Sequence, residues 1–264
     1  MKIALTIAGS DSGGGAGVQA DLKTFQQFGV FGTSVVVALT AQNTRGVRGV
    51  HAAPAAIVEQ QLEAIAEDLP PAALKTGMLA DAALVRQVAA AIARYRWQPY
   101  VLDPVMVATS GDRLLTPDAI SLVRDLLVPL ATVVTPNLDE AELLVGHPVR
   151  NPEAMAAAGQ ALVRLGAGAA LVKGGHLDSA SLLDVLVTPG GTETFRHARV
   201  VTTSTHGTGC TLSAALTAGL ALGRSLETAV RDALQFVHDA IVAAPGLGGG
   251  HGPLNHTVRG PAPA

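Results

Sequence analysis

The strongest constraint on the fold of this chain is an alternation of short apolar runs with longer stretches of helical periodicity. Between the apolar runs, apolar residues recur every three or four positions, as in residues 54–69. The run within residues 34–40 is continuously apolar, which is typical of a strand buried on both faces. This alternation predicts an α/β fold with a mostly parallel central sheet and helices on both faces. The predicted strands are residues 3–8, 34–40, 74–76, 100–102, 132–134 and 169–172.

Other segments are predicted to depart from this pattern. Residues 182–187 and 193–201 predict a strand pair, and the β-branched run at 200–203 predicts the end of a strand. Residues 9–17 and 41–46 are predicted to be loops, the second followed by a short strand. On loop composition, residues 41–53 form a candidate lid.

The composition favours one domain spanning residues 1–264. The chain is 48% apolar and 15% charged, which is enough apolar material for a large core, and it shows no repeat, linker or break. The net charge of −3 argues against a nucleic-acid or anionic-membrane surface. No signal peptide and no apolar stretch of bilayer length is recognised, and the single cysteine fits a reducing compartment. We therefore expect a cytoplasmic protein.

Residues with functional side chains follow almost every predicted strand. In parallel α/β sheets, ligands bind beyond the carboxyl ends of the strands, so these residues are expected to meet at one edge of the sheet. That edge is the predicted ligand site. The residues concerned are Asp11, Gln42, Met78, Asp103, Asn137, Lys173 and the turn at 207–210.

One of these strand ends is a glycine-punctuated turn, Thr205-His206-Gly207-Thr208-Gly209-Cys210-Thr211, that opens a helix. Its glycines let backbone N–H groups point one way, and a helix N-terminus carries unpaired N–H groups and partial positive charge. The turn is therefore a predicted anion site, and the pKa of Cys210 at the helix start is expected to fall. Both features indicate chemistry on a phosphate. The alternative is a tight turn in which Cys210 is a small buried filler.

Asn137 and Glu140 have two interpretations. Asn at an N-cap with Glu three residues later predicts a capping box, which the spacing alone favours. The same amide and carboxylate oxygens can also face a hydrated Mg²⁺. One pair of residues can serve both roles.

Three further features also have two interpretations each. Lys173, before two glycines, is either a point charge for phosphate or a solvated lysine. Asp103, before Pro104, is either directed at a metal or forms a turn. The glycines of residues 9–17 match neither a dinucleotide-binding loop nor a Walker A sequence, so this loop is a flexible turn or a place where a ligand meets the backbone.

The histidines of the chain are scattered, with no paired helical spacing, which argues against a zinc site. His206 and Cys210 permit another interpretation, a cysteine nucleophile with a histidine base. Closeness in sequence is poor evidence for such a pair, because the base usually comes from elsewhere in the fold.

The ordered set of motifs resembles the hydroxymethylpyrimidine/phosphomethylpyrimidine kinases of thiamine biosynthesis, in the ribokinase-like superfamily. Each motif is weak alone, but the set runs in order through nearly the whole chain. The resemblance implies a ribokinase-like fold and an ATP- and Mg²⁺-dependent kinase. Its implied substrates are 4-amino-5-hydroxymethyl-2-methylpyrimidine and then the resulting monophosphate. The matching stretches are residues 5–11, 14–24, 41–44, 75–79, 103–106, 135–137, 173–176 (which ends at His176), 205–211 and 248–256.

The resemblance also implies roles for individual residues. Cys210 is the implied base, and a cysteine where sugar kinases have aspartate indicates the vitamin-kinase branch. The implied anion hole consists of Gly207, Thr208 and Gly209. The residues implied around the pyrimidine are Gln42, Asp21, Gly9 and Met78. The residues implied for ATP phosphates are Lys173, Asn137 and Thr208, and those implied for the metal are Glu140 and Asp103.

Two other functions stay open at this point. Pyridoxine/pyridoxal kinases of the same superfamily share the Gly-Thr-Gly-Cys turn and act on a similar ring with a hydroxymethyl arm. A binding protein without catalysis, which holds a pyrimidine or phosphate to regulate a partner, is the other. The expected partners are ATP and an aminopyrimidine, with no nucleic acid or membrane, and a homodimer is left open.

Overall fold

The computed structural model describes residues 1–106, 116–175 and 181–261, and these residues form a nine-stranded sheet. Its strands lie in the order β3-β2-β1-β4-β5-β6-β7-β8-β9. The strands from β2 to β7 in this order run parallel, while β3, β8 and β9 add antiparallel edges. The strands are β1 (Ile3–Asp11), β2 (Phe31–Asn43), β3 (Gly46–Ala52), β4 (Ala73–Thr76), β5 (Tyr100–Leu102), β6 (Val133–Val134), β7 (Ala170–Lys173), β8 (Ser181–Thr188) and β9 (Gly191–Ala198).

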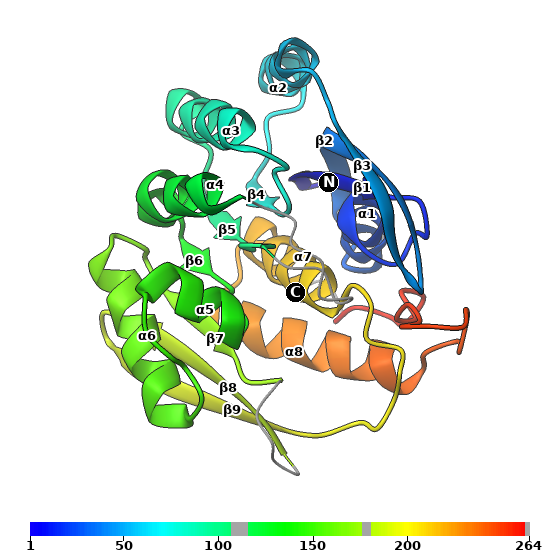
Figure 1. Cartoon of the computed structure of the whole chain (residues 1–264), viewed down its shortest axis with the longest axis vertical. Coiled ribbons are helices and arrows are strands. Elements are labelled where there is room, and N and C mark those ends of the chain that lie inside the picture. Colours follow the sequence, from blue (N-terminus) through cyan, green and yellow to red (C-terminus); the bar gives the residue numbers. More distant parts are fainter. Residues whose placement is uncertain (107–115, 176–180, 262–264) are drawn as a thin grey trace.

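Helices cover both faces of this sheet, as predicted (Figure 1). One face carries α1 (Gly17–Gln27), α7 (Thr208–Ala221) and α8 (Leu226–Val242). The opposite face carries α2 (Ala55–Asp68), α3 (Ala82–Tyr95), α4 (Pro117–Leu122), α5 (Leu138–Val145) and α6 (Pro152–Arg164). After α4 the chain continues as a π-helical turn (Val123–Leu127) and a 3₁₀ turn (Val128–Leu130). Among the helices of the described residues, none combines the length and hydropathy needed to cross a membrane.

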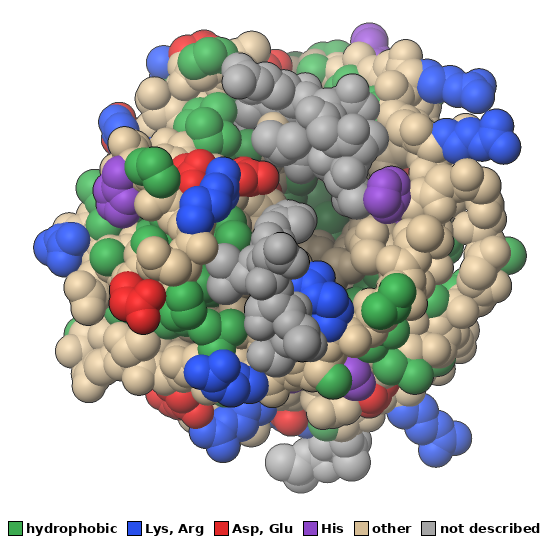
Figure 2. Space-filling view, turned by 60° about the horizontal axis from the view of Figure 1, so that its bottom comes forward, with side chains coloured by type: hydrophobic (Ala, Val, Ile, Leu, Met, Phe, Trp, Pro, Cys, Tyr) green, Lys and Arg blue, Asp and Glu red, His purple; other side chains and the backbone are tan. Residues whose placement is uncertain are grey.

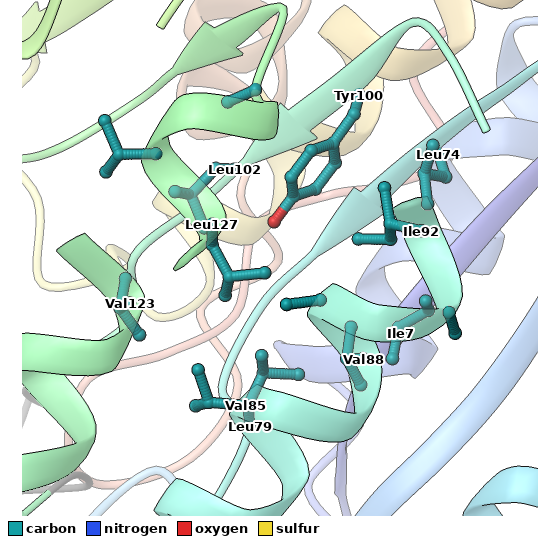
Figure 3. Packing of buried hydrophobic residues seen from close by; sticks show 14 of the residues in the cluster. Ile7, Leu74, Leu79, Val85, Val88, Ile92, Tyr100, Leu102, Val123 and Leu127 are labelled. Atoms are coloured by element: carbon teal, nitrogen blue, oxygen red, sulfur yellow. The ribbon is translucent and has the colours of Figure 1, made fainter. Parts of the chain in front are cut away.

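The central strands are rich in apolar residues on both faces because neighbouring residues pack into different layers. Ala73 packs with α7 and α8, whereas the next residue, Leu74, packs with α3. Val133 and Val134 divide between the two layers in the same way. The second layer is drawn in Figure 3, where Tyr100 lies among aliphatic side chains from β4, β5 and α3. Such strands read as continuous apolar runs rather than as alternating ones.

Two segments predicted as loops belong in part to strands. β1 runs on to Asp11, and β2 runs through Gln42 to Asn43 because β3 pairs with it up to the Asn43–Gly46 pair. The prediction of a loop over 41–46 is therefore wrong except at the turn of residues 44–45. The candidate lid at 41–53 is a β-hairpin in this structure, and its closure over a ligand stays a prediction.

The β-branched run at 200–203 is not a strand. β9 ends at Ala198, and the side chain of Val201 is 97% exposed as the chain crosses from the sheet edge toward α7. β-branched residues favour a strand when cross-strand neighbours pack against them, and the crossing segment has none. The strand prediction at this point is wrong for that reason.

The order of the strands reverses at β1, which has β2 on one side and β4 on the other. β2 and β3 lie on one side of β1, and the strands from β4 to β9 follow in sequence order on the other side. Ligands of open α/β sheets bind in the crevice at such a switch point. Gly9, near the end of β1, and Met78, just after β4, lie at this crevice.

The tail after α8 is irregular, as predicted, but packs against the body of the protein. Pro253 forms a β-bridge with His206, and Leu254 is buried. His256 Nε2 lies 2.9 Å from the hydroxyl of Thr211 in α7. Burial lowers the pKa of His256 to about 4, because a charged imidazole is poorly solvated there.

We expect His256 to make the protein sensitive to mild acid. The unfolded chain binds a proton at His256 near its ordinary pKa of about 6.5, whereas the folded chain does so only near 4. The contribution to stability is therefore complete above pH 6.5 and falls by roughly 3 kcal/mol as the pH drops from 6.5 to 4. Urea unfolding at several pH values checks this. His256→Gln should flatten the slope in this window, and unchanged slopes would refute the assignment.

Candidate active site

The glycine turn is held by close contact with a loop far away in the sequence. Gly207 is the N-cap of α7 with a φ of 83°, and a Cβ there would overlap the carbonyl oxygen of Gly15. A Cβ on Gly15 would lie 2.7 Å from the ring of His206. The glycine-rich loop after β1 therefore packs against the turn, and its glycines serve this close approach.

The turn opens α7, as predicted. The helix begins at Thr208, so the N–H groups of Gly209 and Cys210 lie in the first turn, where a helix leaves N–H groups without intrahelical acceptors. The Thr208 hydroxyl donates to the carbonyl oxygen of Thr205 at 2.8 Å and fixes the turn. The geometry suits an anion, and binding of one stays a prediction.

The partly buried Cys210 thiol lies between the starts of two helices. Its sulfur accepts the backbone N–H of Gly17, the first residue of α1. Burial nevertheless raises the pKa of the thiol to about 12, and the Lys75 ammonium and the Gly17 N–H oppose this only in part. The predicted fall in pKa is wrong, because desolvation of the thiolate outweighs the helix termini. Cys210 is a thiol at neutral pH in the free protein, which also argues against a cysteine nucleophile.

A fully buried ion pair lies close to Cys210. Lys75 Nζ donates to Asp21 Oδ1 at 3.0 Å, and the Thr6 hydroxyl donates to the other carboxylate oxygen at 2.6 Å. Burial alone would lower the pKa of Lys75, but the Asp21 carboxylate raises it above its usual value. Both side chains have no exposed surface. Asp21, expected around the substrate by resemblance, thus lies inside the protein in contact with Lys75 and Thr6, and its role at the site stays a prediction.

Lys173 and Asp103 meet at the start of α7. Lys173 Nζ lies 3.4 Å from Asp103 Oδ1 and 3.3 Å from where a Cβ on Gly209 would be. The hydroxyls of Ser213 and Thr135 also donate to the Asp103 carboxylate, at 3.1 and 3.3 Å. Burial alone would lower the pKa of Lys173, but the carboxylates of Asp103 and Glu140 raise it. A held cation therefore lies beside the predicted anion site.

Asn137 and Glu140 form the predicted capping box at the start of α5. Asn137 Oδ1 accepts the N–H of Glu140 at 2.9 Å, and Glu140 Oε2 accepts the N–H of Asn137 at 2.8 Å. Burial raises the pKa of Glu140 to about 7, and the Asp103 carboxylate adds to this rise. Within the residues that the structure describes, no three His, Cys, Asp or Glu side chains gather into a ready-made metal site.

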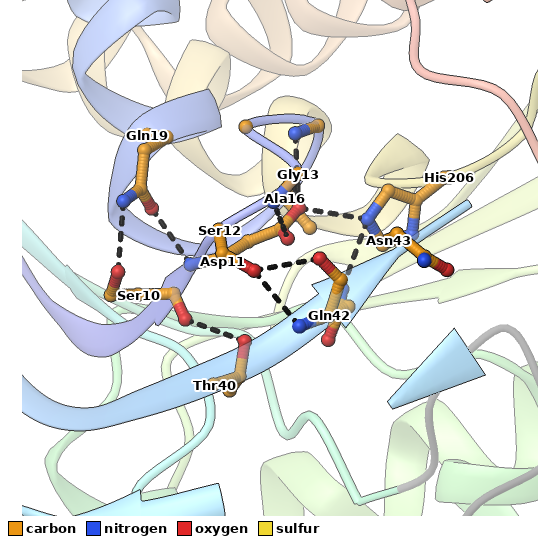
Figure 4. A network of polar contacts seen from close by, with 12 residues as sticks. Ser10, Asp11, Ser12, Gly13, Ala16, Gln19, Thr40, Gln42, Asn43 and His206 are labelled. Atoms are coloured by element: carbon orange, nitrogen blue, oxygen red, sulfur yellow. Dashed lines mark hydrogen bonds and ion pairs between the residues drawn. The ribbon is translucent and has the colours of Figure 1, made fainter. Parts of the chain in front are cut away.

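A second group of side chains surrounds the switch-point crevice. A Cβ on Gly9 would lie 2.5 Å from the end of the Met78 side chain, so these two predicted substrate residues are in contact. Gln42 reaches from β2 to His206, and His206 in turn contacts Asp11 (Figure 4). The backbone of Gln42 is held by the Ser12 hydroxyl, which donates to the carbonyl oxygen at 2.6 Å.

Three residues lie among the candidate site residues although the sequence motifs did not single them out. Lys75 lies inside the short, fully buried strand Ala73–Thr76, and a charge at such a position needs a charged partner buried with it. The sequence indicates His206 only as a base for Cys210, and no pattern in it marks Ser213. His176, part of a matching motif, lies outside the described residues.

Figure 2 shows that one face of the molecule is hollowed near its centre, with a Lys or Arg side chain and a His side chain at the rim.

Phosphoryl transfer depends on positioning and neutralisation of charge rather than on a nucleophilic side chain. The un-ionised Cys210 thiol and the Lys173 ammonium, both at the N-terminus of α7, fit this chemistry. They indicate an α/β phosphotransferase. The chain belongs to the phosphomethylpyrimidine kinase family, whose sequence profile matches residues 11–255. It is a kinase of thiamine biosynthesis, as the order of the motifs implied.

Individual relatives agree with this membership. The chain is 50% identical over 260 residues to the hydroxymethylpyrimidine/phosphomethylpyrimidine kinase of Rhizobium meliloti, with 97% of each chain covered. It is 47% identical over 254 residues to the thiamine biosynthesis bifunctional protein ThiED of Geobacter sulfurreducens, of which it spans only 52%, while 96% of this chain is covered. The ADP complex of Bacillus subtilis pyridoxal kinase has a TM-score of 0.92 at 37% identity, covering 97% of this chain and 98% of that one. The predicted ribokinase-like fold and family are confirmed.

Proposed function

We propose that the chain transfers the terminal phosphoryl group of ATP to the hydroxymethyl group of 4-amino-5-hydroxymethyl-2-methylpyrimidine, and then to the monophosphate to form the diphosphate. The observation that carries this proposal is the position of Cys210. Its backbone lies in the first turn of α7, and its sulfur faces the N–H of Gly17 at the start of α1. A hydroxyl group at this sulfur would lie beside the N–H groups that suit the transferred phosphoryl group.

ATP phosphates are proposed to bind Thr208, Lys173 and Asn137. Lys173 is fixed as a cation at the start of α7 by Asp103, which supports a point charge for phosphate at that place. The capping box occupies Oδ1 of Asn137, so its side-chain N–H₂ group is the atom proposed to donate to a phosphate. The solved structure of a relative with ADP supports ATP as the donor.

Mg²⁺ is proposed to be held by Glu140 and Asp103 through water molecules. Both carboxylates are already engaged: Glu140 accepts the N–H of Asn137, and Asp103 accepts from Lys173. An oxygen-rich site with engaged carboxylates fits Mg²⁺, which keeps several of its waters. The bound ion would offset the charge of the ATP phosphates, and it would favour the ionised form of Glu140, whose pKa is about 7 without it.

Glu140→Gln is expected to raise the Mg²⁺ concentration for half-maximal rate by roughly 10- to 100-fold, the usual effect of a residue that holds a metal through its waters. The capping box tolerates Gln, so thermal stability should change little. Glu142→Gln is the matched control on the same helix, because Glu142 bonds Val149 and Arg150 away from this cluster. A Mg²⁺ titration that Glu140→Gln leaves unchanged would assign Glu140 to the cap alone.

The proposed function is tested by measuring ADP formation with the pyrimidine, with its monophosphate, with pyridoxal and with no acceptor. Pyridoxal kinase is the second candidate, because the overall fold matches a pyridoxal kinase so closely. The Gln42 amide offers a donor and an acceptor side by side, which match the ring nitrogen and amino group of the pyrimidine. A higher kcat/KM for the pyrimidine supports the proposal, and a higher value for pyridoxal favours the alternative. No turnover of either would leave a binding protein.

A cytoplasmic location and assembly as a homodimer complete the proposal. The single cysteine, which permits no internal disulfide, supports a reducing compartment.

The homodimer is supported by exposed large apolar side chains on β2, β3 and α2, which suit a partner surface at that edge of the sheet. They are Phe31, Leu39, Val50 and Ile57. Light scattering on the purified protein gives the mass of the assembly directly.

A further inference from the structure

Side chains from three separate parts of the chain meet at one imidazole nitrogen (Figure 4). His206 Nε2 lies 2.9 Å from Asp11 Oδ2 and 3.0 Å from the side-chain amide nitrogen of Gln42. Asp11 ends β1, Gln42 lies near the end of β2, and His206 precedes α7. The side chains of His206 and Asp11 are only 13% and 3% exposed, so little water competes for these contacts.

Asp11 decides where the proton on His206 resides. Its carboxylate already accepts the backbone N–H groups of Gly13, Gly15 and Ala16 at 2.8 to 2.9 Å. Burial alone would raise the pKa of Asp11, but the hydrogen bonds from His206, Gly13 and Ala16 lower it, so the group is ionised. An ionised carboxylate only accepts hydrogen bonds. His206 must therefore carry hydrogen on Nε2, whether the ring is neutral or doubly protonated.

This proton in turn decides the orientation of the Gln42 amide. A ring nitrogen that carries hydrogen has no lone pair to accept a bond, so an amide N–H₂ group facing it at 3.0 Å would be two donors in contact. The amide oxygen and nitrogen are alike in shape, and rotation by half a turn exchanges them. With Oε1 toward His206, the imidazole N–H is shared between the two acceptors, Asp11 and Gln42, and the N–H₂ group of Gln42 is left for a ligand.

We propose that His206 is a positioning residue: bonded to Asp11, it holds the Gln42 amide with Oε1 toward itself and so decides which way the hydroxymethyl arm of the bound pyrimidine points. The inference rests on the proposed function, in which Gln42 pairs with the pyrimidine edge. Oε1 accepts from the amino group of the pyrimidine, and Nε2 donates to the ring nitrogen next to it. The carbon that bears the hydroxymethyl arm adjoins the amino carbon on the other side.

The arm therefore lies on the Oε1 side of the amide, toward His206 and the turn that leads to Cys210. The reversed amide would pair with the same edge only if the ring turned over, which would carry the arm away from that turn. A pyrimidine bound in this reversed way occupies the site without reacting. His206 thus raises the fraction of bound substrate that is productive, and it does so without touching the reacting atoms.

The variants His206→Leu and His206→Gln test the proposal. Leu removes the donor, whereas the N–H₂ group of Gln has two hydrogens and can serve Asp11 and Gln42 together. We expect His206→Leu to lower kcat for the pyrimidine about twofold, because the two amide orientations then become equally populated and half of the bound substrate is unproductive, with KM unchanged or lower. His206→Gln should recover most of this kcat. A raised KM with unchanged kcat, or equal losses in both variants, would overturn the proposal.

The place of the proton is measured independently by long-range ¹H–¹⁵N correlation NMR on the wild-type protein, with His206 assigned from the signals that His206→Gln removes. Hydrogen on Nε2 supports the proposal, and a neutral ring with hydrogen on Nδ1 alone refutes it. This measurement needs no substrate. Absence of pyrimidine turnover in the wild-type protein would overturn the proposed function, whereas the NMR result decides the orientation at Gln42 in either case.

Discussion

Replacing Cys210 with alanine is expected to slow phosphorylation of the hydroxymethyl alcohol by about 10²- to 10⁴-fold, the usual contribution of a positioned base. Phosphorylation of the monophosphate should fall far less. The alcohol has a proton that must leave as the new bond to phosphorus forms. The phosphate monoester is already largely dianionic at neutral pH, because its second pKa is about 6, and it needs no base.

The surroundings of the Cys210 thiol determine whether it can act as a base. The Cys210 thiol is un-ionised in the free protein because burial raises its pKa to about 12. The groups placed to stabilise a thiolate are the Gly17 N–H and the Lys75 ammonium. If Cys210 is the base, the substrate complex must lower this pKa. The anion site of α7 is built from backbone N–H groups, which the substitution leaves in place.

Separate values of kcat/KM for the alcohol and for the monophosphate check the prediction in wild type and Cys210→Ala. Equal losses with both substrates would mean that Cys210 acts through the shape of the turn. No loss with either would make it a buried filler. Iodoacetamide labelling of the free protein at pH 7.5 should be slow, since little thiolate is present.

Replacing Gly207 with alanine is expected to lower kcat/KM with both substrates by about 10²-fold, because small displacements of a positioning element have effects of this size. The added Cβ would overlap the carbonyl oxygen of Gly15, which is backbone and cannot move without shifting the loop after β1. A φ of 83° adds strain for any residue with a side chain.

Gly223 provides a matched control at the other end of α7. It has a φ of 82°, yet no heavy atom lies within 4 Å of the position of its Cβ. Gly223→Ala therefore reports the cost of the left-handed backbone alone, about 1 kcal/mol of stability, and should keep full activity. If Gly207→Ala behaves like Gly223→Ala in both thermal melts and kinetics, the close contact between the two loops has no role in the site.

Some of the candidate site could be predicted because it depends on neighbours along the chain. The capping box of Asn137 and Glu140 needs only a spacing of three residues, and the helix start at Thr208 needs only the glycine before it. Most strands of the parallel sheet could be predicted from their apolar runs, because helices cover both faces of the sheet. The hairpin formed by β2 and β3 could not be predicted, because the polar residues that end β2 are typical of a loop and only their pairing with β3 makes them a strand.

The alternation of strands and helices and the family follow from local sequence patterns and their order, and the same patterns predict the edge of the sheet at which ligands bind. The state of the side chains at that edge depends instead on how the whole chain packs around them. Tertiary packing raised the pKa of Cys210 where the helix start alone predicted a fall, since burial depends on everything packed around the sulfur. It placed Asp21 inside the protein with Lys75, 54 residues away, and Gln42 against His206, 164 residues away. Contacts over such separations come from the sheet order, and no spacing along the chain encodes them.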